Sequence, residues 1–157
     1  MDMIALEEIR RVKFRYLRCL DLKRWDEMAE TLTADARARY GTPSYGKALE
    51  FDSREAIIEF LRTTVGPGIT TVHFAGQPEI EVDGDTARGT WLLQDKVIVP
   101  EHRVIIEGAA FYEDTYRREN GAWLISDTGY DRLYESMTPL DDLPGFKLTA
   151  NRWSTPA

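Results

Sequence analysis

One carboxylate in the second half of the sequence stands out because its strand neighbours are apolar or small. In residues 86–98, one set of alternate positions is mostly polar, and the other holds Ala87, Gly89, Trp91, Leu93, Asp95 and Val97. Alternate residues of a strand face opposite sides of a sheet, so Asp95 is predicted to lie on the inward face. An unpaired buried carboxylate is costly, so Asp95 needs a partner or a raised pKa, which is typical of a functional acid or base. The alternative is a strand end, where Asp95 would reach water.

A histidine occupies a comparable position in the stretch ITTVHFAG. Alternation places His73 on one face with Thr71 and Ala75, opposite Val72 and Phe74. These small neighbours leave space beside the imidazole, so a histidine facing a cavity is one interpretation. A structural histidine is the other. His102 follows in a predicted turn and is expected to be exposed.

Three further polar residues have both a structural and a chemical interpretation. Tyr16 lies on the apolar stripe of the first predicted helix, where tyrosines usually pack with the hydroxyl at a polar edge. Asp21 follows five residues later and could cap the next helix, which begins near Lys23. Arg132, near the end of the last predicted strand, could lie on the surface.

Several common kinds of site are missing from the sequence. With two histidines and one cysteine, no ligand set with the spacing of a zinc site is present. The glycines in GPG and DGD lack the pattern of a phosphate-binding loop. No Gly-x-Ser-x-Gly motif occurs. We therefore expect neither a metal nor a cofactor.

The hydrophobic periodicity predicts helices first and strands afterwards. Helical spacing joins Leu6, Ile9, Val12, Tyr16 and Leu20 in a first helix, and Trp25, Met28, Ala29 and Leu32 in a short second one. Ser53 is the predicted N-cap of a third helix, which the glycines at 66–68 end. From Ile69 onward the period is two, with hairpin turns at 83–85 and 119–121. This order indicates an α+β domain with helices on one face of a curved antiparallel sheet. The tail, residues 137–157, is expected to be loop that folds back or contacts a partner.

The composition is that of an ordinary globular protein. Its 157 residues are 43% hydrophobic and 30% charged, enough for one domain. The net charge of −7 argues against a nucleic-acid partner. The acidic N-terminal residues do not resemble a signal peptide, and no apolar stretch is long enough to span a bilayer, so we expect a cytoplasmic protein without membrane contacts. The single cysteine, Cys19, is expected to be a small buried apolar residue.

Together, these segments resemble a known family. The stretches YLRCLDLKRWDEM, HFAGQPEIEVDGDTARGTWLLQDKV and YRRENGAWLISDTGYDRLYE, in that order, resemble the SnoaL-like group of the nuclear transport factor 2-like superfamily over roughly residues 4–136. The resemblance implies a cone-shaped, cystatin-like roll: a strongly curved mixed or antiparallel sheet wraps around N-terminal helices and encloses a pocket. The single domain would span residues 1–136. The superfamily is functionally diverse, so the fold alone does not define the chemistry.

Within this group the sequence is most similar to the bile-acid 7α-dehydratases, and more loosely to scytalone dehydratase and the hexachlorocyclohexane dehydrochlorinase. The resemblance implies that His73 is a general base and that Asp21 orients it. Tyr16 and Arg132 would then stabilise a developing oxyanion or a departing hydroxide, and Asp95 would be a second acid–base group or a substrate anchor. The second pocket histidine of scytalone dehydratase has no match here.

The aromatic residues favour a hydrophobic, ring-containing substrate such as a steroid, a polyketide or a lignin-derived aromatic. Trp91 shares the inward face of Asp95, and Tyr112 and Tyr40 are expected to line the same pocket or to pack in the core. The leading prediction is a cofactor-independent lyase, specifically a dehydratase. Alternatives are an isomerase or a carbon–carbon lyase using the same base, a non-catalytic small-molecule binding module, and a subunit of a ring-hydroxylating oxygenase. By resemblance we also expect a homodimer or homotrimer.

Overall fold

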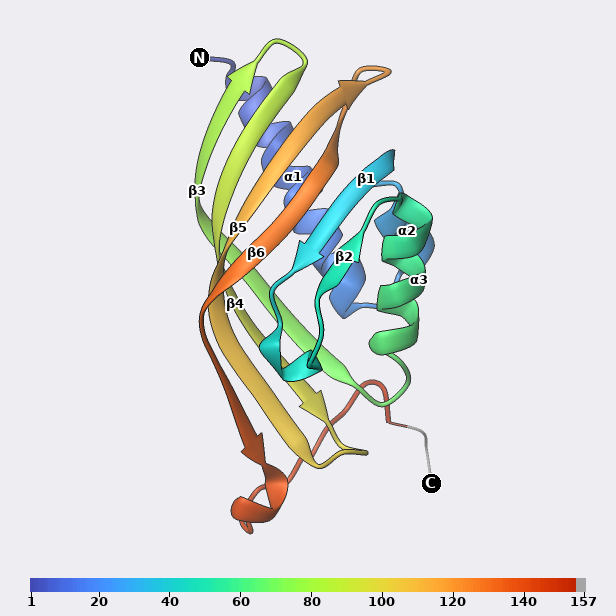
Figure 1. The fold of residues 1–157 in the computed structure, drawn as a ribbon, viewed down its shortest axis with the longest axis vertical. Coiled ribbons are helices and arrows are strands. Elements are labelled where there is room, and N and C mark those ends of the chain that lie inside the picture. The colour runs from blue at the N-terminus through green and yellow to red at the C-terminus, as the bar shows by residue number, and fades with distance from the viewer. Residues whose placement is uncertain (155–157) are drawn as a thin grey trace.

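The computed structural model describes residues 1–154, and the last three residues of the predicted tail lie outside this range. The described residues form an α+β cone (Figure 1). In chain order the elements are α1 (Met3–Asp21), α2 (Trp25–Ala29), β1 (Leu32–Tyr40), η1 (Pro43–Tyr45), β2 (Leu49–Phe51), α3 (Arg54–Thr64), β3 (Thr70–Asp83), β4 (Thr86–Val99), β5 (Val104–Glu119), β6 (Ala122–Pro139) and η2 (Leu140–Asp142).

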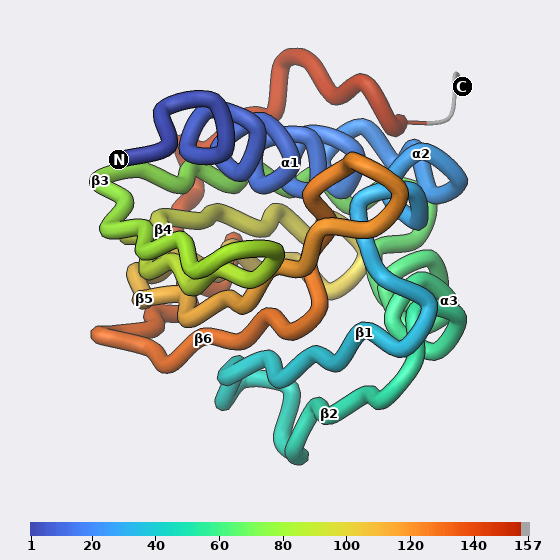
Figure 2. The backbone as a smooth tube through the Cα atoms, turned by 90° about the horizontal axis from the view of Figure 1, so that it is seen from above, coloured from blue at the N-terminus to red at the C-terminus, as the bar shows by residue number. Residues whose placement is uncertain are grey.

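Within residues 1–154, the strands form one six-stranded sheet in the order β2-β1-β6-β5-β4-β3. The strands β3 to β6 are consecutive antiparallel neighbours, whereas β1 pairs with β6 in parallel. Seen from above, the sheet curls around, with α1 beside β3 and α3 near β1 and β2 (Figure 2). The fold class predicted from the sequence, a cystatin-like cone with a mixed sheet, is confirmed.

The first helix provides one wall of the interior. It begins at Asp2, whose side chain accepts a hydrogen bond from the Ala5 amide at 3.0 Å. One stripe of α1 is buried and includes Ile9, Tyr16 and Cys19, in agreement with the predicted face. The helix ends at Asp21, and the left-handed backbone of Lys23 (φ 54°) turns the chain into α2.

The predicted turns and cap are confirmed. Ser53 accepts a hydrogen bond from the Ala56 amide at the start of α3. The two long hairpins turn through the positive φ angles of Gly84 (58°), Asn120 (51°) and Gly121 (82°), which a β-branched residue would disfavour. These tight turns fix the register of β3 with β4 and of β5 with β6.

The prediction of a helical N-terminal third was incomplete, because β1 and β2 also lie there. Leu32 begins β1 rather than ending the second helix. In β1, buried Ala36, Ala38 and Tyr40 alternate with exposed arginines, so the period-two signal was present but short. The partner of β1 is β6, which comes roughly a hundred residues later. Because the pairing is distant in sequence, local periodicity could not reveal it.

The C-terminal segment also differs in part from the prediction. The last strand extends through Pro139, beyond the predicted boundary at 136. The following residues fold back: Thr70 donates a hydrogen bond to the Asn151 side chain at 2.8 Å, and the Lys23 ammonium lies 4.8 Å from the centre of the Trp153 ring. In the part of the chain that the structure describes, no helix is long and apolar enough to cross a membrane.

Candidate active site

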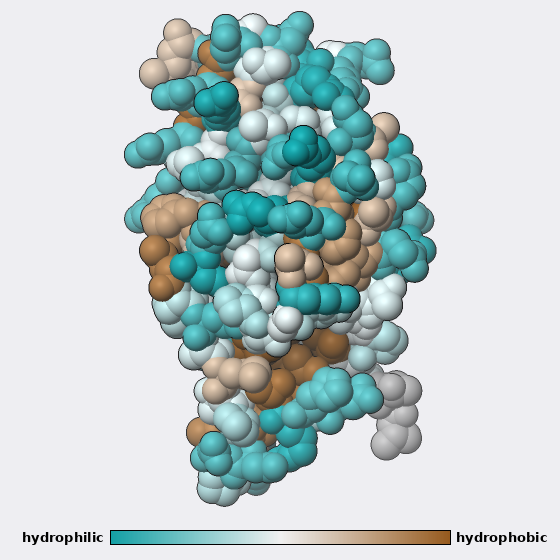
Figure 3. Space-filling model, in the orientation of Figure 1, coloured by the Kyte–Doolittle hydropathy of each residue, from teal (hydrophilic) through white to brown (hydrophobic). Residues whose placement is uncertain are grey.

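A cavity of about 400 Å³ lies between the inner face of the sheet and helices α1 and α3. Its walls are mainly apolar. The aromatic side chains that line it are Tyr16, Tyr40, Tyr45, Phe60, Tyr112 and Tyr130. In the surface view, apolar side chains gather between η1 and the lower ends of β4 and β5, beneath a polar rim (Figure 3). An apolar cavity with a few polar groups is typical of a small-molecule site.

On one side of the cavity, the end of α1 meets β3. The Nδ1 of His73 lies 2.6 Å from Oδ1 of Asp21, and the same oxygen accepts a hydrogen bond from the Thr71 hydroxyl at 2.8 Å. The other carboxylate oxygen accepts from the His73 backbone amide at 2.9 Å. A carboxylate at the C-terminal end of a helix is disfavoured by the helix dipole, and these β3 donors offset that cost. Asp21 is thereby held against the imidazole.

The contact with Asp21 defines the roles of the two ring nitrogens. Because a carboxylate oxygen accepts hydrogen bonds, the neutral imidazole carries its proton on Nδ1. The lone pair of Nε2 then lies on the opposite side of the ring. The side chain of His73 is 13% exposed and borders the cavity, and it also borders a shallow surface hollow between α1 and β3. This arrangement can accept a proton from a ligand at Nε2.

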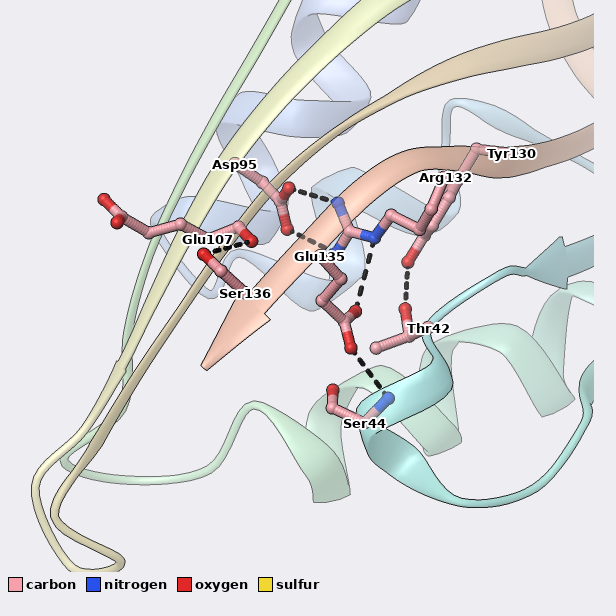
Figure 4. A network of polar contacts seen from close by, with 8 residues as sticks. All are labelled: Thr42, Ser44, Asp95, Glu107, Tyr130, Arg132, Glu135 and Ser136. Carbon is pink, nitrogen blue, oxygen red and sulfur yellow. Dashed lines mark hydrogen bonds and ion pairs between the residues drawn. The ribbon is translucent and has the colours of Figure 1, made fainter. Parts of the chain in front are cut away.

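A second polar cluster lies on β4 and β6 (Figure 4), next to His73, because Asp95 is the residue of β4 that pairs with His73 of β3. The guanidinium of Arg132 forms a two-pronged ion pair with Asp95, in which Nη2 lies 2.9 Å from Oδ2 and Nη1 contacts Oδ1. Its Nε lies 3.3 Å from Glu135, whose other oxygen accepts from the Ser44 amide at 2.7 Å. All three charged side chains are nearly buried: that of Asp95 is 4% exposed, that of Arg132 7% and that of Glu135 10%. Burial alone would lower the pKa of Arg132, but the bonds and charge of Asp95 outweigh it and raise the pKa.

A β-bulge brings Arg132 and Glu135 to the same face. Residues three apart in a regular strand face opposite sides. In β6, however, Arg132 pairs with Ala110 and Tyr134 with Ala109, so Leu133 is an extra residue. Glu135 therefore pairs with Gly108, which is also the partner of Asp95.

The glycine makes room for the guanidinium. A Cβ at Gly108 would lie 2.8 Å from Nη1 of Arg132 and 2.6 Å from the Tyr134 carbonyl oxygen. Arg132 thus lies over Gly108, between the two carboxylates.

Two tyrosine hydroxyl pairs complete the polar part of the cavity. Tyr16 and Tyr40 share a buried hydrogen bond of 2.6 Å, and Tyr130 bonds to the Thr42 hydroxyl. Burial raises the pKa of Tyr16, Tyr40 and Tyr130. The phenols therefore stay neutral near pH 7 and act as hydrogen-bond donors or acceptors rather than as bases.

In the part of the chain that the structure describes, no group of three or more His, Cys, Asp and Glu side chains is arranged to hold a metal ion.

The family relationship is clear from the sequence profile of the SnoaL-like domain, which matches residues 2–128. The chain belongs to the SnoaL-like family.

Solved structures share the fold of this SnoaL-like protein at low sequence identity. A putative scytalone dehydratase from Novosphingobium aromaticivorans superposes with a TM-score of 0.76 at 18% identity, over 86% of this chain and 88% of that chain. A hexachlorocyclohexane dehydrochlorinase from Novosphingobium barchaimii superposes with a TM-score of 0.77 at 17% identity, over 95% of this chain and 97% of that chain. A putative aromatic ring hydroxylase from Novosphingobium aromaticivorans superposes with a TM-score of 0.72 at 19% identity, over 85% of this chain and 92% of that chain.

Most of the residues singled out from the sequence border the cavity of this SnoaL-like domain. His73 touches Asp21, and Asp95 touches Arg132, while Tyr16 contacts Tyr40. Tyr112 lines the cavity as well. His102 is exposed, as expected, and lies at the rim of the cavity.

Asp21 is outside the cavity lining but contacts His73, whereas Trp91 lies away from the site. It is fully buried outside the cavity lining, where its ring contacts Phe14 and its Nε1 donates to the Tyr116 hydroxyl at 3.0 Å. Trp91 and Asp95 do share a strand face, but four residues along a strand span roughly 13 Å. The curved sheet therefore places the indole under α1, and the prediction that Trp91 binds substrate is corrected to core packing.

A buried ion pair beneath the cavity was not predicted from the sequence. Lys13 Nζ lies 2.7 Å from Asp114 Oδ2, and both side chains are 0% exposed. The same ammonium lies 3.3 Å from the centre of the Tyr112 ring. Burial lowers the pKa of Lys13, and Asp114 opposes that shift. The position of Lys13 on the apolar helix stripe, four residues after Ile9, was a signal for this pair.

Thr71 and Glu135 were also missed. Thr71 shares the strand parity of His73, so its contact with Asp21 was open to prediction. Glu135 had no comparable signal, because its position depends on the bulge at Leu133.

Proposed function

We propose that this protein is a cofactor-independent lyase that catalyses a dehydratase-type elimination on a hydrophobic, ring-containing small molecule. The observation that carries the proposal is the 2.6 Å contact between His73 and Asp21 at the wall of an apolar cavity. Two structures with the same fold are named as a scytalone dehydratase and a dehydrochlorinase, which supports this reaction class. The resemblance of the sequence to bile-acid 7α-dehydratases supports it as well.

In the proposed reaction, Nε2 of His73 removes a proton from a carbon next to an electron-withdrawing group. Asp21 accepts the Nδ1–H and stabilises the imidazolium that forms. The electrons of the broken C–H bond form the new double bond as a hydroxide leaves from the neighbouring carbon. The imidazolium proton then neutralises the hydroxide, which departs as water.

Hydrogen-bond donors near the leaving group would lower the barrier. One hydroxyl of the Tyr16–Tyr40 pair donates to the other, and the second proton remains available for the departing oxygen or for a developing oxyanion. We assign Asp95 and Arg132 together as a polar anchor for the substrate, since each is the other's buried partner. The apolar walls, including Tyr112 and Phe60, would hold the ring.

The test uses ring-bearing β-hydroxy ketones, whose dehydration produces a conjugated enone that is followed by its ultraviolet absorbance. His73→Ala and Asp21→Asn should each reduce turnover by at least about 10²-fold, the usual contribution of a general acid–base group. Asp26→Asn, a change at a fully exposed aspartate, is the matched control and should leave turnover unchanged. Wild-type turnover in both site variants, with unchanged circular dichroism, would refute the dyad as the base.

Proton abstraction can also be separated from the later steps. A cyclic ketone without a leaving group should exchange its α-protons for deuterium in D2O, followed by nuclear magnetic resonance, in the wild type and not in His73→Ala. An isomerase or a carbon–carbon lyase would share this exchange but produce no water-loss product. Binding without exchange would favour a small-molecule binding module or an oxygenase-type subunit instead.

We also propose a homo-oligomer, with a dimer expected first, that buries the outer face of the sheet. Phe74 (61% exposed) and Tyr134 (56%) lie on this face, in one row of paired residues across four strands. Light scattering after size exclusion should give a mass of two or three 18.0 kDa chains. A single-chain mass at micromolar concentration would contradict this expectation.

A further inference from the structure

The cluster of Asp95, Arg132 and Glu135 has more acids than bases. A guanidinium has five N–H groups, and in Arg132 one N–H on each of Nη1, Nη2 and Nε faces a carboxylate oxygen. With both carboxylates ionised, the two acids and one base carry one net negative charge. The residues are 4–10% exposed, so water screens this charge weakly.

The other polar groups of the cavity do not supply a compensating positive charge. Among the described residues that line it, Arg132 is the one with a guanidinium or ammonium group. Asp21 adds a further carboxylate, which an imidazolium at His73 would at most neutralise. His102 lies exposed at the rim.

Lys47 lies 5.7 Å from the centre of the Tyr45 ring but is exposed to solvent, and two less exposed ammonium groups near the lining are occupied. Lys23 Nζ donates to the carbonyl oxygens of Val65, Gly66 and Ile69, at distances between 2.6 and 3.3 Å. Lys13 is paired with Asp114 below the cavity floor. A carboxylate entering the cavity would lose its hydration, and the guanidinium of Arg132 would compensate it poorly because two carboxylates already offset that charge.

We infer that this cavity selects uncharged ring molecules and rejects carboxylates and other anions, with Glu135 as a specificity-determining residue. This inference rests on the proposed function in one respect: it assumes that the substrate occupies this cavity. The free lone pairs of Asp95 and Glu135 would accept hydrogen bonds from hydroxyl or amide groups of such a ligand. Arg132, the residue that would otherwise attract an anion, serves to hold the two carboxylates.

The experiment compares two ligands of nearly the same shape, 2-naphthamide and 2-naphthoate, by isothermal titration calorimetry at pH 7. The amide should bind at least tenfold more tightly than the carboxylate, a difference of about 1.4 kcal/mol. In Glu135→Gln, which removes one charge and keeps an oxygen for the Ser44 amide, this preference should fall by at least threefold. Glu81→Gln changes the net charge equally at an exposed position of β3, and should keep the full preference.

Equal or tighter binding of 2-naphthoate would overturn the inference, and so would an unchanged preference in Glu135→Gln. Failure of both ligands to bind would also refute it, because an uncharged ring must be able to enter. The outcome is separable from that of the proposed reaction, since binding is measured without turnover. His73→Ala should keep the preference for the amide even where elimination is lost.

Discussion

Replacing Gly108 by alanine places a methyl group where the guanidinium of Arg132 lies. The new Cβ would be 2.8 Å from Nη1 and 2.6 Å from the Tyr134 carbonyl oxygen, which belongs to the backbone of the paired strand. Contacts this short force either β6 or the Arg132 side chain to move. Overpacking of this kind costs about 1–3 kcal/mol. Any loosening of the buried ion pair between Arg132 and Asp95 would add to this loss of stability. Removing one partner of such a pair completely costs about 3–5 kcal/mol, so a partial loosening costs less than that.

We therefore expect Gly108→Ala to lower the free energy of unfolding by about 3 kcal/mol. For a chain of this length, that corresponds to a fall in Tm of roughly 6–12 °C. Urea denaturation followed by circular dichroism measures the free energy, and differential scanning calorimetry measures Tm. Gly145→Ala is the matched control, because a Cβ there meets no atom within 4 Å. A loss below about 0.5 kcal/mol in Gly108→Ala, the size of an ordinary surface substitution, would refute the placement of Arg132 over Gly108.

Three further predictions concern the interior. Tyr16→Phe removes the hydroxyl that pairs with Tyr40, and should lower kcat more than it changes KM in the enone assay; unchanged kcat would make Tyr16 a packing residue. Lys13→Met leaves the carboxylate of Asp114 without its buried cation, and should cost about 3–5 kcal/mol by urea denaturation, against less than 1 kcal/mol if the pair is unimportant. Burial raises the folded-state pKa of several phenols above the pKa of an unfolded tyrosine, which is about 10. These phenols therefore contribute their full stability below about pH 10. Above that pH the unfolded chain ionises first, and the free energy of unfolding should fall. In a variant that carries Tyr45→Phe and Tyr134→Phe at the two exposed positions, tyrosinate absorbance should therefore appear together with unfolding and not before it. The five buried phenols that remain are Tyr16, Tyr40, Tyr112, Tyr116 and Tyr130.

Local signals in the sequence were most informative where the structure is regular. Helix α1, the N-cap at Ser53 and the two long hairpins follow from periodicity and turn chemistry, which depend on neighbouring residues. Strand β1 was missed because its regular alternation is limited to residues 36–40 and because its partner is distant in the chain. The resemblance to the SnoaL-like group supplied the overall shape, which the family profile then confirmed.

For the candidate site, the sequence by itself determined which residues share a strand face, except beyond the bulge at Leu133 in β6. Alternation placed Asp95 inward and His73 on the face opposite Val72 and Phe74, and the exposure of Val72 (56%) and Phe74 (61%) agrees with that assignment. Strand geometry is local, so this part of the prediction needed no knowledge of the rest of the chain. Alternation did not distinguish Trp91 from Asp95, because it defines a face but not a depth along a curved sheet.

Only the tertiary structure decided which of these side chains meet. Asp21 and His73 are 52 residues apart, and Asp95 and Arg132 are 37 apart. Their contacts depend on how α1 lies against β3 and on the register of β4, β5 and β6. The bulge at Leu133 and the space over Gly108 then place Glu135 beside Arg132. Such contacts result from the packing of the whole domain, which many distant residues determine together, and no short stretch of sequence specifies them.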